Sequence, residues 1–203
     1  MNKKEYFMLI LKAVEKKFGN ADKRLAGDSW PEAWQTLVAT IMSAQTRDEV
    51  TIPVAEELFE TYPNVRKLAS ARERDVLKII KRVNFSKTKA KNVIEAAKVL
   101  VERYNGKVPD SIDELVELPG VGRKTANLVI AECHAKAGIC VDTHVHRISN
   151  VIGLVKTKTP TQTEYALMEI APKKYWSRIN RLFVLWGKSV RGRDRKKILS
   201  ALQ

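Results

Sequence analysis

A ten-residue segment, LPGVGRKTAN at positions 118–127, carries the strongest chemical signal in this sequence. Proline followed by glycine ends a helix, and the apolar stripe that begins at Ala126 predicts a second helix directly after the turn. The unpaired N–H groups at the start of that helix attract anions, and neither Gly120 nor Gly122 has a side chain that would block a phosphate. The segment therefore predicts a phosphate-binding turn between two helices.

The helices that flank this turn are also encoded locally. Ser111 and Glu114 form an S-x-x-E capping box, which predicts a short helix through Leu118. Val121, between the two glycines, is expected to insert into the core. The whole unit of helix, turn and helix is expected to span about residues 111–133.

Lys124 is the residue we expect to act as a nucleophile. It follows Gly122 by two residues, in the first turn of the predicted helix and beside Arg123. A positive helix end and a neighbouring guanidinium both disfavour an ammonium, so a neutral amine becomes available. The alternative is that Lys124 only contacts a phosphate.

A second cluster of polar side chains lies in the segment VDTHVHR at residues 141–147. Asp142 is a good helix N-cap, and a helix start stabilises its carboxylate as the anion. Such an anion can stabilise positive charge on a substrate or help to deprotonate an amine or a water, although the alternative is a cap alone. His144 and His146 have no cysteine or acidic partner at ligand spacing, so we expect no metal here.

Taken together, these segments resemble the endonuclease III family of DNA glycosylases, within the helix-hairpin-helix superfamily whose Gly/Pro-rich hairpin is followed by an aspartate. Four other segments match in family order, namely SAQT at 43–46, KAKN at 89–92, NGKVP at 105–109 and VDTH at 141–144. The resemblance covers about residues 30–190.

The resemblance implies a function and two catalytic residues. Lys124 aligns with the lysine that attacks the sugar C1′, expels the damaged base and leaves a Schiff base, after which β-elimination cuts the strand on the 3′ side. Asp142 aligns with the catalytic aspartate. The implied protein is a bifunctional DNA glycosylase and abasic-site lyase of base-excision repair, acting on oxidised pyrimidines in duplex DNA.

Base chemistry in a duplex requires the nucleotide to be flipped out of the helix. By the same resemblance, Gln45 fills the vacated space and Phe85 is an apolar wedge, where the alternative for a phenylalanine is the core. Ser86 stands where the family has tyrosine, which leaves base preference open. The other expected DNA contacts are Gly120, Val121, Gly122, Arg123, Thr125, His144 and Arg147, and the carbonyls of Leu118 and Val121 are candidate ligands for a monovalent cation.

The fold class expected from the sequence is all-α, because almost no period-two alternation occurs. The resemblance implies a six-helix barrel over residues 27–136 that contains the hairpin, and a second helical domain made of residues 1–26 and 137–203, with the DNA cleft between them. The patterns predict the following helices or helix caps: 4–18, a Ser29–Glu32 cap, 64–70, 72–82, 89–104, a Thr161–Glu164 cap and 175–186.

Composition points to a nucleic-acid partner. Lys and Arg number 37 against 23 Asp and Glu, a formal net charge of +14. Two cysteines, Cys133 and Cys140, make no disulfide framework. Charges interrupt the N-terminal apolar run early and no run can span a bilayer, so we expect a soluble, intracellular (cytoplasmic) monomer without membrane contact.

The C-terminus departs from the family pattern. Most members end in four cysteines, spaced C-x6-C-x2-C-x5-C, that hold a [4Fe–4S] cluster. Residues 185–195 occupy that place here and contain no cysteine. We therefore expect no iron–sulfur cluster and a last domain held by apolar packing around Trp176, Phe183 and Trp186, followed by a basic tail.

Two other functions compete with this interpretation. One is a glycosylase for mismatched uracil or thymine, whose family members tend to lack the lysine at position 124. The other is a non-catalytic helix-hairpin-helix DNA-binding protein, which would need only the hairpin glycines and the positive charge. The joint presence of Gln45, Lys124 and Asp142 argues against a simple DNA binder.

Overall fold

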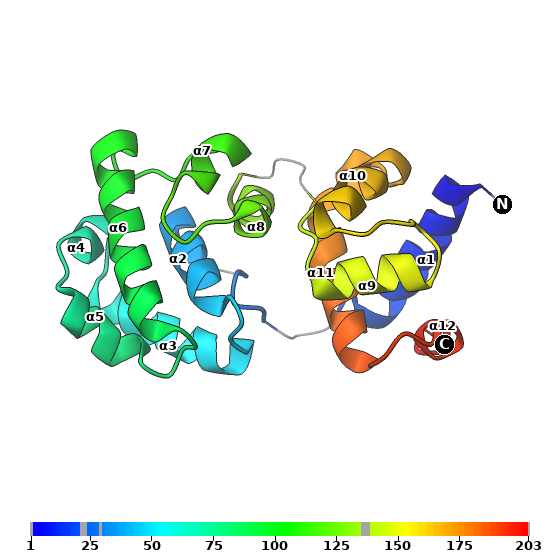
Figure 1. The fold of residues 1–203 in the computed structure, drawn as a ribbon, viewed down its shortest axis with the longest axis horizontal. Coiled ribbons are helices and arrows are strands. Elements are labelled where there is room, and N and C mark those ends of the chain that lie inside the picture. Colours follow the sequence, from blue (N-terminus) through cyan, green and yellow to red (C-terminus); the bar gives the residue numbers. More distant parts are fainter. Residues whose placement is uncertain (1, 21–23, 29, 135–138, 203) are drawn as a thin grey trace. The chain divides into compact units, whose positions relative to one another are not determined.

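The computed structural model describes residues 2–20, 24–28, 30–134 and 139–202. All regular structure in these residues is helical, which confirms the all-α fold class. The chain divides into two compact units, residues 24–135 and residues 1–23 with 136–203, which we call the central unit and the terminal unit (Figure 1). No helix in the described ranges is both long and apolar enough to cross a membrane.

The central unit is built around α2. Its helices are α2 (Ala33–Ser43), α3 (Asp48–Thr61), α4 (Val65–Ala69), α5 (Glu73–Ile80), α6 (Ser86–Tyr104), α7 (Ile112–Val116) and α8 (Arg123–Cys133). α2 packs against α3, α6 and α8, and every side chain from Thr36 to Met42 is buried. Burial on all sides explains why this stretch is apolar around its whole circumference.

The longest helix of the central unit is α6, which also packs against α4 and α5 (Figure 1). It ends where Asn105 and Gly106 adopt left-handed conformations, with φ of 50° and 82°. It begins at Ser86, three residues before the expected start, because Phe85 takes the N-cap position with φ of 59°. The wedge candidate therefore sits at the first turn of this helix.

The predicted hairpin forms, with one shorter helix than expected. The Ser111 hydroxyl accepts a hydrogen bond from the Glu114 N–H at 3.3 Å, as the capping box predicts. α7 ends at Val116, two residues before Leu118, and the turn then leads into α8 at Arg123.

The terminal unit combines the two ends of the chain. Its helices are α1 (Lys3–Phe18), α9 (Thr143–Val151), α10 (Pro160–Ile170), the 3₁₀ turn η1 (Lys173–Tyr175), α11 (Trp176–Ser189) and α12 (Arg195–Ser200). α11 packs against α1 and α9, and its Phe183 and Trp186 are fully buried with their ring centroids 5.5 Å apart. The basic tail is therefore folded in part, since Ile198 of α12 is also fully buried.

Two predicted caps are wrong. α2 is capped by Glu32, whose N–H donates to the side chain of Gln35 at 3.1 Å, while Ser29 lies outside the described residues. α10 is capped by Thr159 and not by Thr161, because Pro160 prefers the first helical position and moves the start two residues upstream.

Candidate active site and DNA interface

The hairpin turn has the geometry of an anion site. Gly120 has φ of +79°, and the Val121 N–H donates to the Leu118 carbonyl at 3.0 Å. Val121 is 7% exposed and belongs to the core of the central unit, so it anchors the turn from below. Gly122 is the N-cap of α8 and is exposed, so the first N–H groups of that helix can be reached by a phosphate.

Glycine is present at positions 120 and 122 for different structural reasons. A Cβ on Gly120 would lie 2.9 Å from Nδ2 of Asn92 on α6, so only glycine fits there. A Cβ on Gly122, which has φ of −97°, would meet nothing within 4 Å. The first glycine is thus required by the fold, whereas the second leaves open space beside the helix start.

Lys124 lies in the first turn of α8, and its residue is exposed. Arg123 and Thr125 on either side of it are half-buried. α8 is held in the core by the buried side chains of Ala126, Val129 and Ile130, as the apolar stripe predicts. The amine candidate is therefore carried on a rigid element next to the anion site.

Asp142 is the N-cap of α9. Its Oδ1 accepts hydrogen bonds from the N–H groups of His144 at 2.9 Å and Val145 at 2.8 Å. Two such donors fix the orientation of the side chain. Both bonds use Oδ1, so the cap and a contact of Oδ2 with a substrate are compatible.

Gln45 and Phe85 lie on two turns that are joined to each other. Asn84 donates through Nδ2 to the carbonyl of Gln45, and its N–H donates to Oγ1 of Thr46 at 3.1 Å. Phe85 is 65% exposed, so the core interpretation of this residue is wrong, and Gln45 is exposed as well. The structure therefore brings the two proposed insertion residues together. The roles of Asn84 and Thr46, which connect the two turns, were not predicted from the sequence.

His144 packs inside the terminal unit. A Cβ on Gly187 of α11 would collide with the imidazole of His144, so the ring lies directly against the backbone of that helix. The residue is half-buried. Its contact with DNA remains a prediction.

Arg147 joins α9 to the segment that follows α11. Its guanidinium donates to the carbonyls of Gly187 and Val190, each at 3.0 Å, and to the carbonyl of Gly192. The last carbonyls of a helix lack intrahelical donors, and a cation is favoured at that end. The phosphate contact predicted for Arg147 stays a prediction, and the sequence did not reveal this role because its partners lie about forty residues away.

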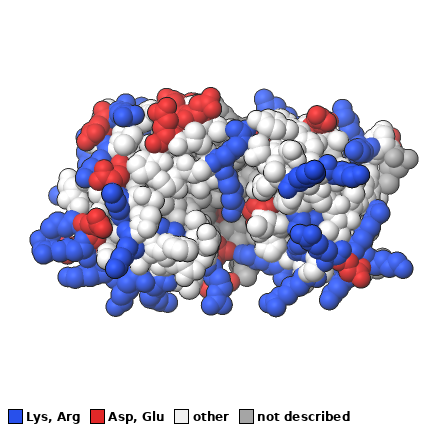
Figure 2. All heavy atoms as spheres, viewed as in Figure 1, with Lys and Arg blue, Asp and Glu red and all other residues white. Residues whose placement is uncertain are grey.

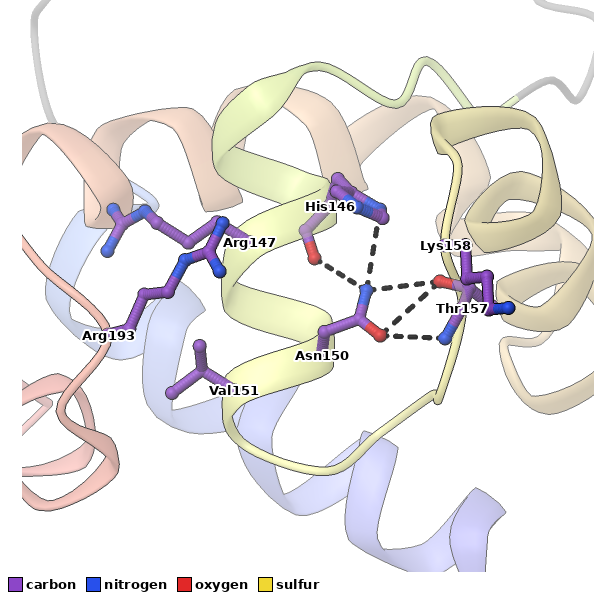
Figure 3. A pocket seen from close by; sticks show the side chains of 7 residues that line it. All are labelled: His146, Arg147, Asn150, Val151, Thr157, Lys158 and Arg193. Atoms are coloured by element: carbon purple, nitrogen blue, oxygen red, sulfur yellow. Dashed lines mark hydrogen bonds between the residues drawn. The ribbon is translucent and has the colours of Figure 1, made fainter.

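A basic groove runs beside Arg147 (Figure 3). It has a volume of about 380 Å³, and its lining residues are His146, Arg147, Asn150, Val151, Thr157, Lys158 and Arg193. His146 forms a contact of 2.6 Å with the hydroxyl of Thr163, and the Thr157 N–H donates to Oδ1 of Asn150 at 2.8 Å. These contacts order the turn before α10. The side chains that line the groove include basic residues and no acidic residue.

The net positive charge of the chain belongs almost entirely to the terminal unit. The terminal unit has 20 Lys and Arg against 7 Asp and Glu, a net charge of +13, and the central unit has 17 against 16, a net charge of +1. On the face shown in Figure 2, blue basic side chains cover much of the terminal unit, with few red acidic ones among them. This unit therefore supplies the electrostatic attraction for a polyanion.

The residues of the chain do not fit a [4Fe–4S] cluster. Such a cluster requires four thiolates, and the sequence has two cysteines. Burial raises the pKa of the Cys133 thiol, and Cys140 is buried. The described part of the chain holds no group of three or more His, Cys, Asp or Glu residues that could bind a metal ion.

Comparison with known proteins identifies the class. The model of a family described as HhH-GPD superfamily base excision DNA repair protein matches residues 38–173, which span both units. The chain belongs to this superfamily.

Similarity to individual proteins narrows the class to the endonuclease III family, of which the chain is a member. Endonuclease III of Thermotoga maritima is 44% identical over 159 residues, which cover 78% of this chain and 75% of that protein. Endonuclease III of Bacillus subtilis is 34% identical over 172 residues, 80% of this chain and 78% of that protein. A structure of endonuclease III trapped as a covalent intermediate with DNA matches with a TM-score of 0.85 at 31% identity, over 93% of this chain and 88% of that one.

Proposed function

We propose that this protein is a bifunctional DNA glycosylase and abasic-site lyase of base-excision repair. The observation that carries the proposal is an exposed Lys124 in the first turn after an anion-binding hairpin, in a chain of the endonuclease III family that also has Asp142 at a helix N-cap. A DNA-binding module would require the hairpin and the charge but neither of these two side chains.

Lys124 supplies the covalent step. Its neutral Nζ forms a bond to C1′ of the damaged nucleotide while the bond from C1′ to the base breaks, and the base leaves with a proton. Opening of the sugar gives a Schiff base between Nζ and C1′. Loss of a proton from C2′ then breaks the bond from C3′ to its oxygen, which cuts the strand on the 3′ side of the lesion.

Asp142 assists from the other unit of the chain. The two N–H donors at Oδ1 fix the orientation of the carboxylate, and we assign Oδ2 to the reacting sugar. A fixed negative charge stabilises the positive charge that develops on the sugar as the base departs.

Duplex DNA is the proposed partner, with oxidised pyrimidines as the substrate class. Backbone N–H groups at Gly120, Gly122 and Arg123 are assigned to a strand phosphate, and the carbonyls of Leu118 and Val121 to a monovalent cation beside it. Gln45 and Phe85 are assigned to the gap left by the flipped nucleotide. The charge of the terminal unit supports non-specific attraction along the duplex.

The protein is further proposed to work as a monomer and without an iron–sulfur cluster. The two cysteines and the Arg147 contacts after α11 support the second point, because a loop held by side chains replaces one held by metal. Metal analysis of protein purified without oxygen tests it, and stoichiometric iron with sulfide would contradict it.

Incision assays test the activity. The enzyme is incubated with labelled duplexes that contain thymine glycol, uracil or thymine opposite guanine, or no damage. Each reaction is divided in two, one half is treated with alkali, and both halves are separated on a denaturing gel. We expect cleavage of the thymine glycol strand without alkali. Cleavage of a mismatch strand only after alkali indicates the mismatch glycosylase, and binding without cleavage in either condition indicates a simple DNA binder.

A further inference from the structure

A buried lysine holds the turn that carries Gln45. Lys89 lies in the first turn of α6 and is 6% exposed. Its Nζ donates to the carbonyl of Met42 at 2.7 Å, to the carbonyl of Ala44 at 2.5 Å and to Oγ1 of Thr46 at 3.2 Å. All three acceptors come from the end of α2 and the turn after it.

These contacts explain why a lysine is buried here. The last carbonyls of α2 have no intrahelical donor, and the negative end of a helix attracts a cation. A buried ammonium is costly unless it is fully hydrogen-bonded, and its three acceptors match the three donors of Lys89. The Lys89 side chain therefore caps the C-terminal end of α2 and connects it to α6.

The same contacts reach the second turn. Oγ1 of Thr46 accepts from both Lys89 and the N–H of Asn84, and Asn84 also holds the carbonyl of Gln45. Lys89 is therefore part of a hydrogen-bond network that joins the turn at Gln45 to the turn at Phe85.

The two proposed insertion residues have strained backbones. Gln45 has φ of 55° and Phe85 has φ of 59°, in a region that residues other than glycine seldom adopt. Such conformations cost on the order of 1 kcal/mol or more and persist only where the surrounding contacts impose them. The network imposes them before any DNA is bound.

We propose that Lys89 is a positioning residue for base extrusion, which holds the Gln45 and Phe85 turns in the arrangement that enters the duplex. This inference rests on the proposed function. Opening a base pair costs free energy, which contacts of the insertion residues with the opened duplex offset in part. Insertion residues that are already ordered lose less conformational entropy on binding, so their contacts offset more of this cost. Lys89 touches neither the substrate nor the reacting atoms, so it acts through the two turns.

The test compares lesions that need different amounts of extrusion. Single-turnover excision rates are measured for wild type and Lys89→Met on a duplex with thymine glycol opposite adenine and on one with thymine glycol opposite a tetrahydrofuran abasic analogue, where no partner base has to be separated. We expect Lys89→Met to slow the paired substrate about tenfold or more and the unpaired one much less. Equal slowing on both substrates indicates a structural role only and overturns the proposal.

Control variants keep the result interpretable. Lys98→Met makes the same change on the same helix, at a lysine with a half-exposed ion pair to Glu95, and is expected to leave both rates unchanged. Lys89→Arg keeps the charge and is expected to restore most of the paired rate. Asn84→Ala removes an exposed part of the network. If Lys89→Met does not fold, a normal rate of Asn84→Ala on the paired substrate overturns the inference.

Failure of this inference is distinguishable from failure of the proposed function. A wild-type protein that excises thymine glycol from neither duplex contradicts the glycosylase assignment and the inference with it. A wild-type protein that is active, with Lys89→Met equally active, contradicts only the role of Lys89.

Discussion

Replacement of Arg147 by methionine is predicted to destabilise the C-terminal end of the terminal unit. Methionine is also a long, unbranched side chain, but it has no donor. The carbonyls of Gly187, Val190 and Gly192 would lose their shared partner. α12, which begins three residues after the last of these carbonyls, depends on that loop for its position.

The size of the effect follows from the number of bonds. Hydrogen bonds to a charged group contribute about 1.5–3 kcal/mol each when buried. Arg147 is half-buried and one of its three bonds is exposed, so solvent reduces their sum below even the low end of that range, and we expect a loss of about 2–4 kcal/mol. At about 4–8 °C per kcal/mol for a unit of this size, the thermal midpoint of the terminal unit falls by roughly 10 °C or more. Arg147→Lys, which cannot span three carbonyls, is expected to fall in between.

Calorimetry, which gives the thermal midpoint, and amide hydrogen exchange test this prediction. For Arg147→Met we expect a lower thermal midpoint and faster exchange at the N–H groups of α12, while the exchange rates in α2 and α6 are unchanged. Arg193→Met is the matched control, because Arg193 is exposed in the same groove, and it is expected to cost less than about 0.5 kcal/mol. A loss for Arg147→Met as small as that of the control would refute the view that this side chain holds the segment.

Two other predictions concern the central unit. Gly120→Ala forces a methyl group against Asn92 at positive φ and should destabilise the unit by about 1–3 kcal/mol, whereas Gly122→Ala has open space, so urea unfolding should be unchanged while affinity for duplex DNA falls. Burial lowers the pKa of Lys89 from 10.5 to about 8, so its desolvation cost is present below pH 8 and is relieved as pH rises toward 10.5 with loss of the proton. Single-turnover pH profiles should therefore show the ratio of wild-type to Lys89→Arg rates falling above about pH 8; parallel profiles would contradict this.

The features that could be predicted from the sequence are those determined by neighbouring residues. The cap of Ser111, the turn at Gly120 and the cap of Asp142 each depend on contacts within three residues, and each is found in the structure. The helix boundaries that shifted also have local causes. Pro160 sets the start of α10, because proline is favoured at the first helical position.

The supports of the site could not be predicted in the same way. Arg147 binds carbonyls about forty residues downstream, and backbone carbonyls have no sequence signature. Lys89 did leave a signal, because it lies on the buried stripe of α6 with Val93 and Leu100 at helical spacing. A charged residue on an apolar stripe indicates a buried contact, but its partners at the end of α2 are set by tertiary packing alone.

The covalent role of Lys124 is best tested by sodium borohydride trapping on a labelled duplex with one abasic site. Wild type, Lys124→Ala and Asp142→Asn are compared for adduct formation, and the adduct of wild type is mapped by peptide analysis. We predict a trapped adduct on Lys124 with wild type, none with Lys124→Ala, and slow formation with Asp142→Asn. Bound duplex without an adduct in wild type, or an adduct of equal yield in Lys124→Ala, would contradict the Schiff-base mechanism.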